Sequence, residues 1–186
     1  MSVVVLAAQG SNAVELTTIV DFLRRSGANV IVASTNTSTL LVKCGQEISV
    51  ECDINFNDIQ NKDYDMVVVV GGIPGANNIA DYAPAVDFVK KHFNANKIVA
   101  SLCASPGTVL AEACGIMKGR KGCGYPGFDS QIETTGGILL QDNVVIDGNL
   151  ITSRAPGTSQ IFAIALIKAL LGDEKANQIK SFMMVQ

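Results

Sequence analysis

The sequence predicts an α/β fold in which a doubly wound, mostly parallel sheet carries helices on both faces. Short runs of β-branched and other apolar residues are typical of strands that are buried on both sides of a parallel sheet. Stretches with helical spacing of apolar residues separate these runs, and Gly and Pro fall singly at the boundaries. Strands that alternate with helices predict β-α-β units, and the length of 186 residues suits one domain over residues 1–186.

The amino-terminal part predicts one such unit followed by a hairpin. The apolar run at residues 2–8 predicts a buried strand. A helix is expected over residues 13–26, because apolar side chains recur there with helical spacing and Gly27 follows as a stop signal. Residues 29–34 predict the second strand, and two β-rich runs between residues 40 and 51 predict a hairpin.

The middle of the chain repeats the alternation. The valine-rich stretch at residues 65–72 predicts a central strand that ends in two glycines. Residues 81–93 predict a helix with Asp81 as its N-cap, and residues 97–103 predict the next strand. A helix with small residues in its first turn is expected directly after Cys103.

The carboxyl-terminal third begins with a less regular region. Residues 119–153 predict short strands and turns. A long helix is expected over residues 155–172, with Pro156 near its start, where a proline is tolerated. A short helix is expected to end the chain.

Composition and charge argue against several classes of function. With 48% hydrophobic and 17% charged residues, the chain is expected to be globular rather than disordered. The net charge of −3 and the lack of a long Lys/Arg cluster argue against a nucleic-acid or membrane partner. The longest apolar stretch is interrupted by Lys168 and falls short of the ~20 residues of a membrane span. Because the amino terminus has no basic segment typical of a signal peptide, we expect a cytoplasmic protein.

The cysteines and the single histidine give no pattern for a metal or another cofactor, and we expect none. The cysteines are Cys44, Cys52, Cys103, Cys114 and Cys123. They form no C-x-x-C pair and His92 is the only histidine, so neither a zinc site nor, in a reducing cytosol, a disulfide is expected. The two cysteines near the hairpin are expected to be structural rather than regulatory. The Asn-Thr-Ser tripeptide at 36–38 is interpreted as a chance match to a glycosylation acceptor.

Cys103 is the candidate nucleophile. It stands where a predicted strand turns into a helix, so its sulfur is expected near a helix N-terminus, which favours an anion. The helix dipole contributes ~0.3–2 kcal/mol, whereas lowering a thiol pKa by two units requires ~2.7 kcal/mol. Hydrogen bonds from N–H groups are therefore needed as well, and the small residues Ala104 and Ser105 let amides approach. A buried structural cysteine is the alternative, and it is the better interpretation for Cys114 inside the helix.

Gly71 and Gly72 end the neighbouring predicted strand. Glycines at such a point allow backbone N–H groups to come close to a ligand, as in an oxyanion hole. An ordinary tight turn is an equally good interpretation. The spacing is not G-x-G-x-x-G, so no dinucleotide site is implied.

Glu15 also has two interpretations. With Asn12 it fits a capping box, in which its side chain bonds back to the Asn12 amide. Alternatively, its carboxyl group faces Cys103 across the crevice. An ionised Glu15 would raise the pKa of the thiol, so the pair favours a thiolate only if Glu15 keeps its proton and donates it to the sulfur. Such a pair shares its titration.

These strand ends resemble those of the PfpI/ThiJ family, also called the DJ-1 family, over nearly the whole chain. The resemblance rests on the strings VVLAAQGSNAVE, FLRRSGANVIVAS, DMVVVVGGIPGANN, SLCASPGTVLA and LITSRAPGTS. It implies a flavodoxin-like fold of the class I glutamine amidotransferase type, a homodimer, and an elbow cysteine paired with a protonated glutamate. It also implies glyoxalase or deglycase activity on reactive dicarbonyls and oxidation of the cysteine, while some relatives are amidase- or peptidase-like.

Two departures from the family pattern bear on the mechanism. Many members place a histidine before the proline of the string that reads GCGYPGFD here, where this chain has Tyr125, and a phenol is a poor base at neutral pH. His92 is expected to be a solvated or dipole-favourable residue at the basic C-terminal end of a helix, so no Cys–His dyad is expected and amide hydrolysis loses support. Gln46 stands where some relatives carry an arginine near the partner subunit's site, while Arg25 and Arg154 remain as possible supports of the site.

The function implied by the residues and the resemblance is that of a glyoxalase or deglycase without a cofactor. The Cys103 thiolate would attack the aldehyde of methylglyoxal, and Glu15 would move protons between the adjacent carbons until a 2-hydroxy acid is released. The amides of Gly72 and Ala104 would hold the oxyanion. The alternative is a redox sensor or chaperone whose Cys103 is oxidised to a sulfinate, and an amidase- or peptidase-like hydrolase is less favoured.

Overall fold

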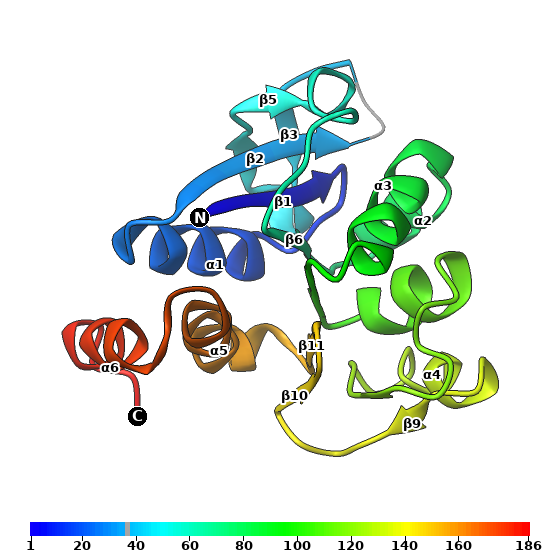
Figure 1. The fold of residues 1–186 in the computed structure, drawn as a ribbon. Coiled ribbons are helices and arrows are strands. Elements are labelled where there is room, and N and C mark those ends of the chain that lie inside the picture. Colours follow the sequence, from blue (N-terminus) through cyan, green and yellow to red (C-terminus); the bar gives the residue numbers. More distant parts are fainter. Residues whose placement is uncertain (36–37) are drawn as a thin grey trace.

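A seven-stranded sheet with the strand order β10-β11-β7-β6-β1-β2-β5 runs through the molecule (Figure 1). The structure is a computed structural model that describes residues 1–35 and 38–186, so two residues of the tripeptide at 36–38 lie outside the described residues. Neighbouring strands of this sheet are parallel, except that β10 is antiparallel to β11. The strands are β1 (Ser2–Ala8), β2 (Asn29–Thr35), β5 (Ile54–Asn55), β6 (Met66–Val69), β7 (Ile98–Leu102), β10 (Val144–Asp147) and β11 (Leu150–Ser153).

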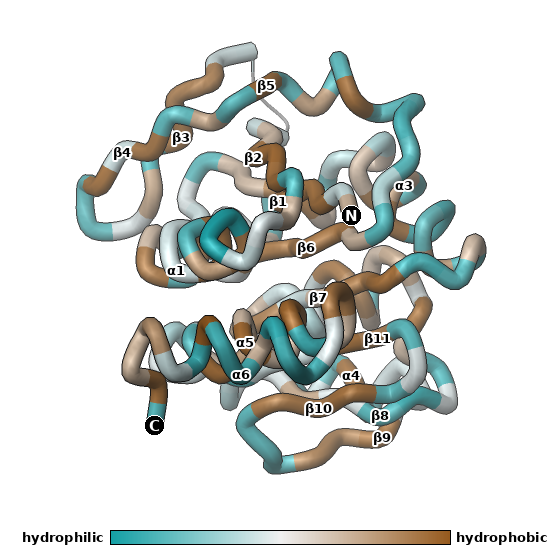
Figure 2. Tube along the Cα trace, turned by 60° about the vertical axis from the view of Figure 1, so that its left-hand side comes forward, coloured by the Kyte–Doolittle hydropathy of each residue, from teal (hydrophilic) through white to brown (hydrophobic). Residues whose placement is uncertain are grey.

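Helices cover both faces of this sheet, which confirms the predicted fold class (Figure 1). One face carries α1 (Ala13–Arg25), α5 (Ser159–Leu171) and α6 (Asp173–Phe182), and the other carries α2 (Gly75–Ala80), α3 (Ala83–Asn94), a π-helix (Pro106–Ala113) and α4 (Ser130–Thr134). Along β1, Val3 and Val5 pack into the hydrophobic core on the face covered by α1, α5 and α6. Val4 and Leu6 pack into the core on the opposite face. Central strands are therefore mostly apolar, as Figure 2 shows for β6, although β7 includes the buried Ser101.

The predicted hairpin is present beside the amino end of α1. Its strands β3 (Leu41–Lys43) and β4 (Ser49–Glu51) are antiparallel and are joined by a 3₁₀ turn at Gly45–Glu47. A second small sheet pairs β8 (Lys121–Gly122) with β9 (Ile138–Leu139). None of the helices in the described part of the chain has the length and apolar character of a membrane span.

Gln9 fastens the hairpin to the loop that follows β1. Its side-chain amide donates to the Leu41 carbonyl over 2.9 Å and accepts the Lys43 N–H over 2.8 Å. The Gly45 N–H also donates to the Ser11 carbonyl over 3.1 Å. The hairpin thus helps to hold the loop that leads into α1.

Several predicted element boundaries differ from the structure. Asp81 is not the N-cap of the following helix, since it ends α2, a short helix that the sequence did not predict. Helix α3 begins at Ala83 and is preceded by Tyr82, which makes no side-chain capping bond. The long carboxyl-terminal helix begins with a 3₁₀ turn at Pro156–Thr158 before α5, and the region predicted as short strands and turns also contains α4.

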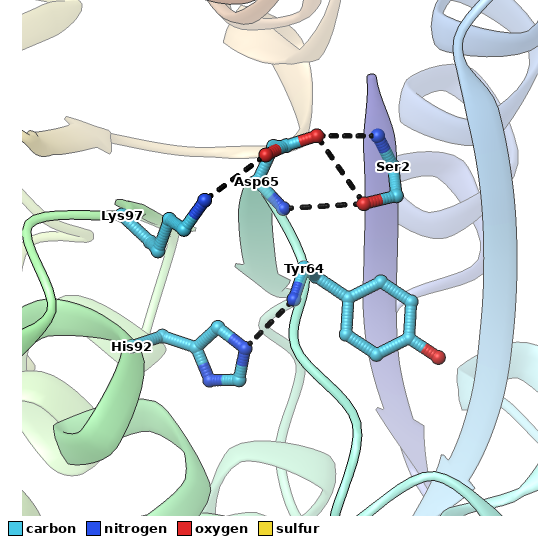
Figure 3. Close-up of polar contacts among 5 residues, drawn as sticks. All are labelled: Ser2, Tyr64, Asp65, His92 and Lys97. Atoms are coloured by element: carbon cyan, nitrogen blue, oxygen red, sulfur yellow. Dashed lines mark hydrogen bonds and ion pairs between the residues drawn. The ribbon is translucent and has the colours of Figure 1, made fainter.

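His92 is buried, with 1% of its surface exposed, so the expectation that it is solvated was wrong. Its Nε2 accepts the Tyr64 N–H over 3.1 Å (Figure 3), and its Nδ1 lies 2.8 Å from the Phe88 carbonyl oxygen. A backbone N–H can only donate and a carbonyl can only accept, so these two bonds fix a neutral imidazole with its proton on Nδ1. Because Tyr64 precedes β6, His92 lies at the amino ends of the strands, opposite the edge where β7 leads into Cys103.

Acidification is expected to destabilise the folded protein through His92. Burial lowers the pKa of His92 below its ordinary value of 6.5. The unfolded chain therefore binds a proton that the folded chain excludes, and the free energy of unfolding falls as the pH drops below about 6.5. Relative to His92→Gln, the wild type is expected to lose up to ~1.4 kcal/mol per pH unit in this range. Urea unfolding at a series of pH values between about 7 and 5 measures the difference.

Asp65→Asn is the matched control, because Asp65 belongs to the same polar cluster (Figure 3). Hydrogen bonds from Ser2 and the charge of Lys97 lower the pKa of Asp65, so its own contribution to stability is lost only at more acidic pH. This variant should keep the wild-type pH dependence between about 7 and 5. An equal pH dependence in wild type and His92→Gln would show that the imidazole is not responsible.

Candidate active site

The three predicted strand ends meet at one edge of the sheet. Strand β6 lies between β1 and β7. The loop from β1 into α1 carries Glu15 into the first turn of that helix, Gly71 and Gly72 follow β6, and Cys103 follows β7. Because the strands are parallel, their carboxyl ends share the crevice in which open α/β sheets bind ligands.

Cys103 forms a sharp elbow between β7 and the π-helix. Its φ of 64° lies in the left-handed region, which costs a non-glycine residue ~1–3 kcal/mol and persists only where the surroundings enforce it. Two backbone hydrogen bonds enforce it here: the Cys103 N–H donates to the Ser153 carbonyl over 3.0 Å, and the Tyr125 N–H donates to the Cys103 carbonyl over 2.8 Å. The sulfur lies close enough to the backbone N–H groups of Gly72 and Ala104 for both to lower its pKa.

Glu15 is completely buried, and its carboxyl group faces the elbow rather than the helix cap. Asn12 does cap α1, since its side chain accepts the Glu15 N–H over 3.2 Å. The Asn12 N–H, however, donates to the Gly71 carbonyl over 2.9 Å, so Glu15 does not return the bond of a capping box. Instead, Oε2 of Glu15 accepts the Gly71 N–H over 2.8 Å, and the carboxyl group interacts with the Cys103 thiol. Of the two interpretations of Glu15, the structure supports the one that places it beside Cys103.

Gly71 leaves the space in which the two side chains meet. A Cβ atom at this position would lie 2.6 Å from Cβ of Cys103, 2.8 Å from the Leu102 carbonyl oxygen and 2.9 Å from Oε2 of Glu15. Real Cβ atoms do not approach heavy atoms so closely. A side chain at position 71 would therefore separate the carboxyl group from the thiol.

Gly71→Ala is expected to lower turnover of the substrate by about 10²-fold, because a displacement of about 1 Å at a reacting group has effects of this size. The overpacked site should also lower the free energy of unfolding by ~1–3 kcal/mol. Gly157→Ala is the matched control, since a Cβ at Gly157 has no heavy atom within 4 Å. Steady-state kinetics and urea unfolding measure both effects, and wild-type turnover in Gly71→Ala would contradict the role given to this space.

The carboxyl group of Glu15 and the thiol of Cys103 are electrostatically coupled. Burial raises the pKa of Glu15 to about 7, although the Cys103 thiol and the Gly71 N–H act in the opposite direction. Burial, the negative charge of Glu15 and its hydrogen bond raise the pKa of Cys103 to about 12, against the N–H groups of Gly72 and Ala104. Because the groups interact, the proton lost near pH 7 belongs to the pair rather than to one residue. If Glu15 keeps the remaining proton, its charge no longer raises the thiol pKa, and two N–H donors stabilise the thiolate.

The structure brings together Cys103, Glu15, Gly71, Gly72 and Ala104, but not every predicted supporting residue. Arg25 lies near the far end of α1, where it pairs with Asp21 over 2.8 Å and stacks on the ring of Phe182. Arg154 directly follows β11 and donates to the Gln141 carbonyl over 3.2 Å. The backbone of Tyr125 touches the elbow, as described above, while 43% of its surface is exposed.

The other four cysteines are buried free thiols. Burial raises the pKa of each of them, to about 12 for Cys52 and Cys114. No group of three His, Cys, Asp or Glu side chains that could hold a metal ion occurs within residues 1–35 and 38–186. Cys103 is therefore distinguished from the other thiols by the acid and the amide donors around it.

Ser153 is a contributor to the site that sequence reasoning missed. Its carbonyl accepts the Cys103 N–H, and its hydroxyl bonds to the Asn143 carbonyl over 2.8 Å and to the Thr158 hydroxyl over 2.7 Å. This role depends on the register between β11 and β7, in which Ser153 stands opposite Leu102. No pattern in the sequence specifies that register.

The chain is similar to known proteins over nearly its whole length. Residues 1–169 match the sequence model of the DJ-1/PfpI family. The chain is 36% identical to Protein DJ-1 homolog B of Arabidopsis thaliana over 98% of its own length, but it spans only 41% of that longer protein. It is 31% identical to the glutathione-independent glyoxalase DJR-1.2 of Caenorhabditis elegans, over 96% of this chain and 92% of that protein. Among solved structures it resembles oxidized DJ-1 of Toxoplasma gondii, with a TM-score of 0.93, 32% identity and coverage of 98% and 97% of the two chains.

Proposed function

Because this chain belongs to the DJ-1/PfpI family, we propose that it is a cofactor-independent glyoxalase or deglycase with Cys103 as nucleophile and Glu15 as proton carrier. The observation that carries the proposal is that a completely buried carboxyl group and an elbow thiol meet beside Gly71, where the backbone N–H groups of Gly72 and Ala104 lower the pKa of the thiol. A thiolate next to a protonated acid supplies the nucleophile and the proton that addition to an aldehyde requires. The similarity to a protein named a glutathione-independent glyoxalase supports the same activity.

The proposed reaction begins when the Cys103 thiolate adds to the aldehyde carbon of methylglyoxal. A C–S bond forms, the carbonyl electrons move to oxygen, and the N–H groups of Gly72 and Ala104 hold this oxyanion until Glu15 protonates it. The Glu15 carboxylate then removes the hydrogen from this carbon and returns a proton to the adjacent carbon, which leaves a thioester of a 2-hydroxy acid. Water hydrolyses the thioester, so the net reaction is methylglyoxal plus water to lactate, and the thiol is regenerated.

The activity is tested with the purified protein and methylglyoxal in the presence of a chelator and without glutathione. We expect loss of methylglyoxal and formation of one lactate for each molecule consumed. Consumption without lactate would show that the aldehyde only modifies the protein. That result would overturn the proposed enzymatic function.

We also propose that the protein acts as a cytoplasmic homodimer. Val14 on α1 and Leu41 and Ile48 of the hairpin are large apolar side chains that are about half exposed, at 54%, 51% and 48%. The hydrogen bonds between the hairpin and the loop before α1 hold these elements side by side. Analytical ultracentrifugation of wild type and of Leu41→Lys is expected to show a dimer that weakens in the variant.

A redox sensor is the second candidate, and the same donors around the sulfur support it. A sulfinate at Cys103 would accept hydrogen bonds from protonated Glu15 and from the N–H groups of Gly72 and Ala104. The solved relative from Toxoplasma gondii is described as oxidized. Mass spectrometry after mild peroxide treatment is expected to find two added oxygens at Cys103 alone, and equal oxidation of the other four cysteines would reject this candidate. A Cys–His hydrolase gains no support, since His92 lies at the opposite edge of the sheet.

A further inference from the structure

We propose that Ile73 and Tyr125 form an apolar rim around the Cys103 thiol, which makes the site selective for aldehydes with an uncharged, apolar substituent such as a phenyl group. This inference rests on the proposed function, because it names the substrate class of the same site. It is carried by the position of the two residues and by their exposed apolar surface.

The segment that carries Tyr125 lies directly against the elbow. The Tyr125 N–H donates to the Cys103 carbonyl over 2.8 Å. A Cβ at Gly124 would lie 3.3 Å from the same carbonyl oxygen, so the chain before Tyr125 is equally close. The side chain of Tyr125 therefore leaves the backbone next to Cys103, and 43% of the residue is exposed.

Ile73 approaches the thiol from the neighbouring strand end. It directly follows Gly72, whose backbone N–H lowers the pKa of the Cys103 thiol. It is 46% exposed, although isoleucine is a residue that folding normally buries. Two segments next to Cys103 thus each carry a large side chain that neither hydrophobic core includes.

The two arginines that were expected to support the site already have hydrogen-bond or ion-pair partners. Arg154 is bonded to the Gln141 carbonyl, and Arg25 is paired with Asp21. A carboxylate or phosphate group on the aldehyde would lose water against the apolar rim. An apolar substituent would instead gain contact with the rim.

The experiment compares kcat/KM for phenylglyoxal and for methylglyoxal in wild type, Ile73→Ser, Tyr125→Ala and Tyr125→Phe. We expect kcat/KM for phenylglyoxal divided by kcat/KM for methylglyoxal to fall by about 10-fold in Ile73→Ser and in Tyr125→Ala. This is the lower end of what an apolar contact contributes to specificity. Tyr125→Phe keeps the ring and should keep the ratio. Ile138→Ser is the matched control, because Ile138 is 48% exposed but lies on β9 in the second small sheet.

A second measurement tests the rim without turnover. The rates at which N-phenylmaleimide and unsubstituted maleimide alkylate Cys103 are followed by mass spectrometry of the peptide that contains it. The rate with N-phenylmaleimide divided by the rate with maleimide should fall in Ile73→Ser and Tyr125→Ala and stay constant in Ile138→Ser. Lack of turnover of both aldehydes by wild type would overturn the proposed function, whereas unchanged ratios in both rim variants would overturn the rim.

Discussion

Replacing Cys103 by serine is expected to abolish turnover of methylglyoxal, with kcat lowered by about 10³-fold or more, as is found when a catalytic nucleophile is removed. The hydroxyl group of serine is far less acidic than a thiol, so the N–H groups of Gly72 and Ala104 and a protonated Glu15 cannot stabilise enough of its anion at neutral pH. The fold should be unaffected, because oxygen replaces sulfur without added volume. Steady-state lactate formation and a urea unfolding curve measure the two quantities.

Cys114→Ser is the matched control for this substitution. Cys114 is also a buried thiol, and it follows the π-helix that begins shortly after Cys103. Its sulfur lies 3.8 Å from the Val86 carbonyl, away from the acid and the amide donors of the site. We expect its turnover to stay within about two-fold of wild type. Wild-type turnover in Cys103→Ser would show that another group carries out the chemistry.

Elements with a regular apolar pattern could be predicted from the sequence. Elements that depend on packing between distant segments could not. The strands β1, β6 and β7 are apolar except at Ser2 and Ser101, because helices cover both faces, and that pattern is visible in the sequence. Helix α2 has the sequence GANNIA, which has no capping residue and too few apolar side chains to show a period. The π-helical form of residues 106–113 depends on packing and has no sequence signal that we recognise.

His92 shows that one signal was present and was given too little weight. Helix α3 buries Ala85, Phe88, Val89 and His92, which recur with helical spacing. This spacing places His92 on the apolar stripe, whereas its lysine neighbours suggested an exposed helix end. A polar residue on the buried face of a helix is expected to find partners, as His92 does with Tyr64 and Phe88.

The sequence predicted which strand ends form the candidate site, but it did not predict how their side chains are arranged. The order of the parallel strands implies that the segments after β1, β6 and β7 meet. Local sequence could not decide between a capping box and a functional Glu15, because the deciding contacts join Asn12 and Glu15 to Gly71, which is far away in the sequence. The distance of Arg25 from the site, by contrast, follows from its position in the last turn of α1, which the helix predicted over residues 13–26 already implied.

Replacing Glu15 by glutamine is expected to lower kcat for methylglyoxal by about 10²–10⁴-fold, the range that general acid–base catalysis contributes. Glutamine can still accept the Gly71 N–H and can donate to the sulfur, but it cannot release or take up a proton. The wild-type kcat/KM should rise with pH as the pair loses its first proton near the Glu15 pKa of about 7. In Glu15→Gln, the rise of kcat/KM near pH 7 should be lost, because the carboxyl group that takes part in this titration is absent.

The alkylation rate of Cys103 shows whether Glu15→Gln lowers turnover by removing the proton carrier or by making the thiol less reactive. The charge of Glu15 and its hydrogen bond both raise the pKa of the thiol, so their removal in Glu15→Gln should lower that pKa. Iodoacetamide should therefore modify Cys103 at neutral pH at least as fast as in wild type, while turnover is lost. Slower alkylation would mean that the carboxyl group acts mainly by stabilising the thiolate. Full turnover would mean that protons reach the substrate by another route, and the role of Glu15 in the proposed reaction would have to be abandoned.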